Sequence, residues 1–118
     1  MSYFSAPNLI RVAAALLILC AAMHTSGWRS TRARFPGEQR SMAALLWFLL
    51  GIDWIVLGLV WLFAATGGRP MQPLLLATAA VPIAVAIGMA ATVSARFPPV
   101  YLQATAAALL IAGALKLS

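Results

Sequence analysis

Charge is scarce in this sequence of 118 residues. Only 8% of the residues are charged, and only two of those are acidic, whereas about 25% charged residues are usual in a soluble domain. So few charged side chains cannot cover a surface that faces water. Disorder requires high charge and low hydrophobicity, so the same shortage excludes a disordered chain.

Cysteine and histidine are also scarce, with a single Cys20 and a single His24. One cysteine excludes a disulfide framework, and one histidine cannot form a zinc site alone. The sequence also has no Ser–His–Asp arrangement, no glycine-rich phosphate loop and no paired carboxylates. We therefore expect no metal site and a protein that is not an enzyme.

Apolar residues are what the sequence has in abundance, at 64% of the total against roughly 45–50% in an ordinary soluble domain. They form four runs, at residues 6–25, 42–66, 71–95 and 98–117. Each run reaches the roughly 20 residues that cross a hydrocarbon core, and none alternates as a barrel strand does. The sequence thus predicts an all-α integral membrane protein, a four-helix transmembrane bundle in a single domain. We interpret the first run as a retained helix rather than a signal peptide, because only Arg11 precedes its apolar stretch.

The basic residues lie at the ends of these runs and give a net charge of +6. The first loop and the third carry five of them, and the opposite side carries three: Arg29, Arg32, Arg34, Arg40 and Arg96 against Arg11, Arg69 and Lys116. The positive-inside rule then places the arginine-rich loop in the cytoplasm and both termini outside, in a bacterial inner membrane. Basic residues near the membrane surface attract anionic lipid. We expect no binding of nucleic acid.

Small residues at four-residue spacing are expected to hold the bundle together, because lipid provides no hydrophobic drive between helices. The third run has Ala80, Ala84 and Gly88, the fourth has Ala104, Ala108 and Ala112, and the first has Ala13, Ala14, Ala15, Ala21 and Ala22. Pro82 in the third run is expected to kink that helix and to free the carbonyl of Thr78.

A stripe of indoles and glycines marks the second run. Its members recur at spacings of four and three residues, within about 40° of one line along a helix: Trp47, Gly51, Trp54, Gly58 and Trp61. One interpretation is that the stripe packs against alanine-rich neighbours or lipid. The other is a contact face for another subunit, a pigment or a flat apolar ligand, in which case Trp54→Leu would loosen a complex and leave the bundle intact.

Asp53 is the one acidic residue inside a run, close to the middle of the membrane. An aspartate at that depth costs roughly 2.5–3.5 kcal/mol on insertion scales and marks a candidate functional site. It could serve as a proton site or as an ion-pair partner. Alternatively, since burial disfavours the charged form, it is a neutral carboxyl hydrogen-bonded to a neighbouring helix. It points about 120° away from the indole stripe.

His24 ends the first run, where it could ligate a haem or another pigment, or bond a lipid headgroup or a loop. It lies near the membrane surface, about 14 Å from Asp53 in depth, so the two residues cannot form a dyad.

The segment His24-Thr25-Ser26-Gly27 resembles a family of small bacterial four-helix membrane proteins of no established activity. In that pattern an alanine- and leucine-rich helix ends in His-Thr-x-Gly, and a segment like Phe97-Pro98-Pro99 introduces the fourth helix. The architecture is loosely similar to the DoxX-like group. In length the chain also resembles the small multidrug-resistance exporters. Their membrane-embedded glutamate lies in the first helix, however, where this chain has no acidic residue.

Three functions are weighed on this basis. We expect a non-enzymatic structural or accessory subunit that packs against other membrane subunits. The alternative is an intramembrane site for a lipid, quinone or pigment such as a tetrapyrrole, for which Asp53, Gln103 and Thr105 are the available polar groups. The third is a small proton-coupled transporter that uses Asp53.

Overall fold

The computed structural model describes residues 3–118, which form helices and turns and contain no strand. Four segments in this part of the chain are helical, long and apolar enough to cross a membrane. The predicted all-α four-helix class is therefore confirmed. The helical bounds differ from the four apolar runs by at most three residues at either end when the first span is taken as Ala6–Ser26, beyond which the helical segment continues into the loop as far as Arg34.

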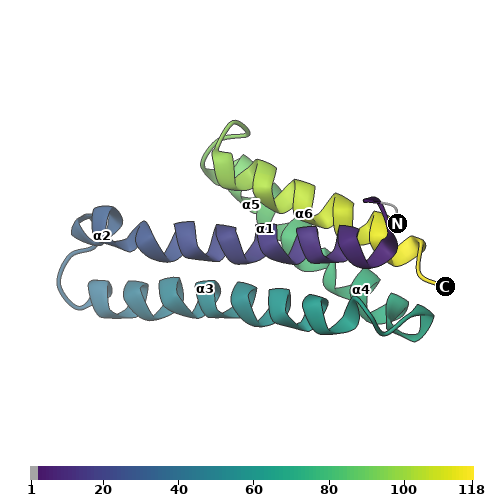
Figure 1. The fold of residues 1–118 in the computed structure, drawn as a ribbon. Coiled ribbons are helices and arrows are strands. Elements are labelled where there is room, and N and C mark those ends of the chain that lie inside the picture. Colours follow the sequence, from purple (N-terminus) through teal and green to yellow (C-terminus); the bar gives the residue numbers. More distant parts are fainter. Residues whose placement is uncertain (1–2) are drawn as a thin grey trace.

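Within residues 3–118 there are six α-helices and two short 3₁₀ turns, which form the four spans and part of the first loop (Figure 1). The first span is α1 (Ala6–Ser26), followed by α2 (Trp28–Thr31) and η1 (Arg32–Arg34) in the arginine-rich loop, and the second is α3 (Gln39–Ala64). The third contains η2 (Arg69–Met71), α4 (Gln72–Thr78) and α5 (Ala80–Thr92), and the fourth is α6 (Pro98–Leu115).

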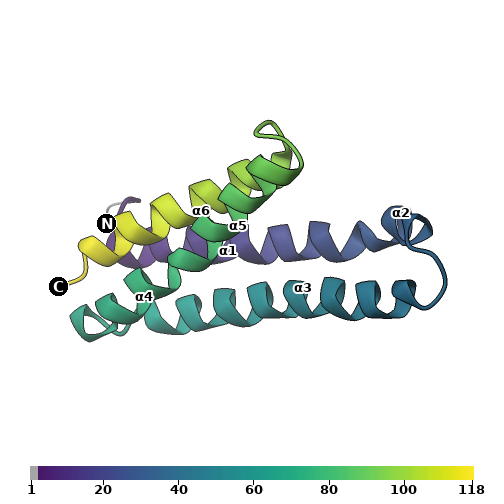
Figure 2. The same ribbon diagram turned by 180° about the vertical axis from the view of Figure 1, so that it is seen from behind.

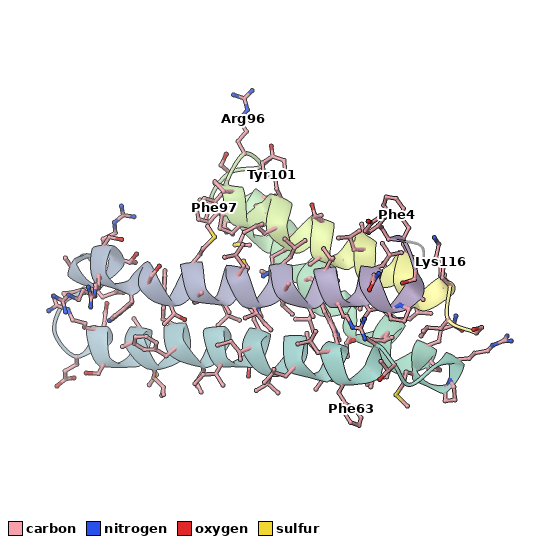
Figure 3. All side chains as sticks on the ribbon, viewed as in Figure 1. Phe4, Phe63, Arg96, Phe97, Tyr101 and Lys116 are labelled. Carbon is pink, nitrogen blue, oxygen red and sulfur yellow. The ribbon has the colours of Figure 1, made fainter. Side chains whose placement is uncertain are left out.

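Helix α1 is central to the bundle and packs against α3 and against α6, while α5 packs against α6. Figures 1 and 2 show α3 running alongside α1, with the α5–α6 hairpin on the other side of α1 and diverging from it toward the loop that joins α5 to α6. The two ends of the chain lie together: Lys116 Nζ donates to the carbonyl of Phe4 at 3.1 Å, and the Arg69 amide donates to Ser118 at 3.2 Å (Figure 3). This end holds the three basic residues that the sequence places opposite the arginine-rich loop.

The third span is interrupted between α4 and α5, at Ala79. Pro82 has no amide hydrogen to give to the Thr78 carbonyl, so the expected break is found where the proline predicts it. The Thr78 hydroxyl lies at this break and accepts a hydrogen bond of 2.9 Å from Trp61 Nε1 of α3. This hydrogen bond joins α4 to α3 at the break.

Small residues hold α1 against its neighbours, as expected for Ala13, Ala14 and Ala21, which are buried. On α6, a Cβ added at Gly113 would lie 3.1 Å from the Ala6 carbonyl oxygen and 3.2 Å from the Ile10 amide nitrogen, so the backbones of α1 and α6 approach closely there.

The other two expected small-residue faces point outward, and the prediction that they pack inside the bundle is wrong. Every member of the two sets is exposed: Ala80, Ala84 and Gly88 on α5, and Ala104, Ala108 and Ala112 on α6. Helix α6 instead packs through a neighbouring face that includes Gln103, Ala107 and Leu110. Ala15 and Ala22 of α1 are also exposed. A small side chain is compatible with lipid as well as with a helix, so four-residue spacing alone does not decide the packed face.

Candidate functional site

The inner face of α3 is built on two glycines. A Cβ added at Gly58 would lie 2.7 Å from Ile18 Cγ1 and 3.3 Å from the Ala14 carbonyl oxygen, and one added at Gly51 would lie 2.7 Å from Thr25 Oγ1. The backbone of α3 thus approaches the backbone of α1 at Gly58, and seven residues earlier, at Gly51, it lies against the Thr25 side chain of α1. Only glycine allows so close an approach.

The indoles beside these glycines are part of the core. Trp61 is fully buried and Trp54 is 2% exposed, and Trp54 also contacts the His24 ring at a centroid distance of 5.0 Å. The stripe of Trp47, Gly51, Trp54, Gly58 and Trp61 therefore packs on α1, within the chain. The interpretation of this stripe as a free face for a subunit, pigment or ligand is corrected accordingly: the alanine-rich helix that it meets is α1.

His24 and Trp47 bond each other's backbone carbonyls at the loop end of this interface. His24 Nε2 lies 2.9 Å from the Trp47 carbonyl oxygen, and Trp47 Nε1 donates to the His24 carbonyl at 2.6 Å. A carbonyl oxygen only accepts, so Nε2 carries the ring proton. The two rings also stack, with centroids 4.3 Å apart. Nδ1 keeps the lone pair that a haem iron would need, so ligation of a pigment stays a prediction, and through Nε2 His24 acts here as a clamp between α1 and α3.

Aromatic rings continue from this clamp into the arginine-rich loop. Trp28 contacts Trp47 at 5.7 Å, Phe48 at 6.3 Å and Phe35 at 6.0 Å between ring centroids. Arg40 Nε donates to the carbonyl of Phe35, and the other arginines of the loop are exposed. Rings and basic residues gathered in this way suit the headgroup level of a membrane.

The polar groups considered for an intramembrane ligand site do not converge. Gln103 is fully buried against α1 and donates from Nε2 to Cys20 Sγ at 3.3 Å, whereas Thr105 and Asp53 are exposed. Gln103 Oε1 and Trp54 Nε1 are both buried without a hydrogen-bond partner. An open cavity of about 150 Å³ lies at the end of the bundle that holds the chain termini, lined by residues such as Ala6, Thr66 and Lys116. None of the three predicted polar residues lines it.

Asp53 lies on the outer face of α3. The residues around it are exposed as well, including Leu49 (45%), Ile52 (52%) and Val56 (53%). Further along the helix, Phe63 is 82% exposed, and Figure 3 shows it projecting from the side of α3 opposite to α1. Within residues 3–118, no hydrogen bond or ion pair is made to Asp53. Its carboxyl is an unpartnered polar group on an apolar surface, about 16 Å from the Ala64 end of α3.

The ionisable and nucleophilic side chains within the spans have separate surroundings. Asp53 faces outward from α3, His24 lies against Trp47, and Cys20 is buried beside Gln103. No group of three or more metal-ligating side chains occurs in the part of the chain that the structure describes. Helical periodicity predicted that Asp53 points away from the tryptophans, but the sequence analysis did not identify the outer face of α3 as the exposed one.

No protein-family model matches this chain, and no curated protein or solved structure matches it either.

Proposed function

We propose that this chain is a non-enzymatic structural subunit of a membrane assembly, and that it docks through the outer face of α3. The observation that carries this proposal is the exposed carboxyl of Asp53 at mid-span. An apolar helix surface is satisfied by lipid, so it requires no partner on its own. A carboxyl at the same depth does require one.

The energetic reason is desolvation. An aspartate in the hydrocarbon core costs roughly 2.5–3.5 kcal/mol on insertion scales, and hydrogen bonds to another helix offset part of that cost. Asp53 makes no such bond within residues 3–118. A helix outside this chain, with a hydrogen-bonding group at the same depth, supplies what the chain itself lacks.

The small-residue faces of α5 and α6 add support. Gly88 has no atom within 4 Å of the position that a Cβ would take, and its neighbours Ala80 and Ala84 are exposed with it. Small residues let a helix of another subunit approach closely enough for van der Waals packing in lipid. The chain thus offers more than one face to neighbouring subunits.

The orientation is proposed from charge. The arginine-rich loop faces the cytoplasm of a bacterial cell, and the termini lie on the outer side of its inner membrane. Support comes from the excess of basic residues on the loop side, where five lie against three at the end that holds Phe4 and Ser118.

Native mass spectrometry after extraction in mild detergent tests the docking role. The wild-type chain is expected in a particle heavier than one copy, and Asp53→Leu is expected to release single chains because leucine has no hydrogen-bonding group. Asp53→Asn keeps the particle, since an amide both donates and accepts. Ile52→Leu, an apolar exchange at the next position on the same face, is the matched control. A wild-type chain that is recovered alone, or an Asp53→Leu particle of unchanged mass, contradicts the proposal.

Proton-coupled transport is the competing interpretation of Asp53 and predicts a different result. Asparagine cannot exchange a proton, so Asp53→Asn would then abolish coupled substrate movement in membrane vesicles. A severe Asp53→Asn defect with an unchanged particle mass would favour the transporter.

A further inference from the structure

The outer face of α3 carries a second heptad pattern, in addition to that of the tryptophans. Starting at Met42, its members follow at alternating spacings of four and three residues, and we call them the outer seam: Met42, Leu46, Leu49, Asp53, Val56, Val60 and Phe63. All are exposed except Val60, which is half-buried. Apolar residues at this spacing are typical of a helix that winds around a neighbouring helix.

The inner face of the same helix already follows this geometry. Trp47, Trp54 and Trp61 recur every seven residues, as do Gly51 and Gly58, and this period matches a left-handed supercoil. The period that suits the contact of α3 with α1 is thus repeated on the outer side of the same helix. The outer seam therefore has the spacing of a coiled-coil surface, and the helices within residues 3–118 leave it exposed.

Asp53 is the central member of the outer seam and its one polar member. A single polar residue at a core position of a coiled coil sets the register of the helices. In lipid it also provides the attraction, because leucine and lipid tails are equally apolar. The partner helix must therefore place a hydrogen-bonding group opposite Asp53.

We infer that the partner is a second copy of this chain, which pairs along α3 so that the two Asp53 carboxyls hydrogen-bond to each other. Two copies inserted in the same orientation are related by a two-fold axis along the membrane normal, which places equivalent residues at the same depth. A protonated carboxyl both donates and accepts, so one Asp53 is the complement of the other. The outer seam is self-complementary as well: when two copies pair in the same orientation, its apolar residues meet apolar residues and Asp53 meets Asp53.

This pairing rests on the docking role proposed above and specifies its partner. Disulfide crosslinking in membranes tests it, using two co-expressed copies with different tags and Cys20→Ser to remove the native thiol. Val56→Cys, on the outer seam next to Asp53, is expected to give a crosslinked dimer that carries both tags. Ile87→Cys is the matched control, because Ile87 is 65% exposed but lies on α5, away from the seam.

Asp53 variants in the Val56→Cys background test the carboxyl pair. Asp53→Leu is expected to lower the association constant of the dimer by about 3- to 30-fold, the range of an interhelical hydrogen bond in lipid. Asp53→Asn is expected to keep the dimer, since paired amides also donate and accept.

The remaining outcomes separate the inference from the function on which it rests. Crosslinks from Val56→Cys to a protein of another mass, with none between the two tagged copies, would show that the partner is not a second copy of this chain. The docking role of the outer face of α3 would then stand. No crosslink of either kind would overturn both. Equal crosslinking from Ile87→Cys would mean random collision and overturn the pairing. A dimer unaffected by Asp53→Leu would overturn the role of the carboxyls.

Discussion

The close approach of α1 and α3 at Gly58 leads to a quantitative prediction. In Gly58→Ala the new methyl group would lie 2.7 Å from Ile18 Cγ1 and 3.3 Å from the Ala14 carbonyl oxygen. The second of these atoms is backbone, so relief requires the two helices to move apart. Inserting a methyl group into a well-packed interface of this kind costs about 1–3 kcal/mol.

Gly88→Ala is the matched control, because the same methyl group meets no atom within 4 Å there. Both glycines lie inside helices, so both substitutions gain the same helix propensity of about 1 kcal/mol. Subtracting one variant from the other removes that gain and leaves the steric cost. We expect Gly58→Ala to be less stable than Gly88→Ala by about 1–3 kcal/mol, and Gly88→Ala to be at least as stable as the wild-type chain.

The measurement is the free energy of unfolding in mixed micelles, titrated with a denaturing detergent. Tryptophan fluorescence reports unfolding, because Trp54 and Trp61 leave a buried interface. Equal stability of the two alanine variants would refute the close α1–α3 contact and with it the placement of the indole stripe inside the chain.

Three further predictions concern the core and the orientation. Trp54→Leu is expected to lower the unfolding free energy of the isolated chain by about 2 kcal/mol or more; an unchanged free energy with a lost assembly would restore the stripe as a partner face. Gln103→Leu is expected to be neutral or stabilising in the same titration, because Gln103 Oε1 is buried without a partner, while Gln103→Ala leaves a cavity and is destabilising; a large loss in Gln103→Leu would reveal a partner for that oxygen. An alkaline phosphatase fused after Ser118 is expected to be active, since the enzyme matures outside the cytoplasm; an inactive fusion with a fluorescent cytoplasmic reporter at the same site would reverse the proposed orientation.

The sequence predicted those features of the fold that are properties of one helix taken alone, without its neighbours. The positions of the spans follow from the thickness of the hydrocarbon core, which requires about 20 apolar residues from any helix that crosses it. The break at Thr78 and Ala79 follows from the missing amide hydrogen of Pro82. The opposition of Asp53 and the tryptophans on α3 follows from helical geometry alone.

The sequence left undetermined which face of each helix lies inside, and it led to errors there. In water, burial separates apolar from polar faces, but in lipid both the alanine face of α5 and the indole face of α3 are compatible with either side. Spacing therefore placed Ala80, Ala84 and Gly88 in the bundle, whereas the structure leaves them outside.

Only the tertiary structure decided these faces, because the choice depends on how closely two particular backbones can approach. At Gly51 and Gly58, α1 lies so close to α3 that a Cβ atom on α3 would clash with it. This contact buries the tryptophans beside the two glycines. The same contact turns the opposite side of α3 outward and leaves Asp53 without a hydrogen bond or ion pair to any of the residues that the structure describes. The sequence determined that this aspartate lies in the middle of a helix long and apolar enough to cross a membrane; the packing of α1 on α3 determined that it faces away from the bundle.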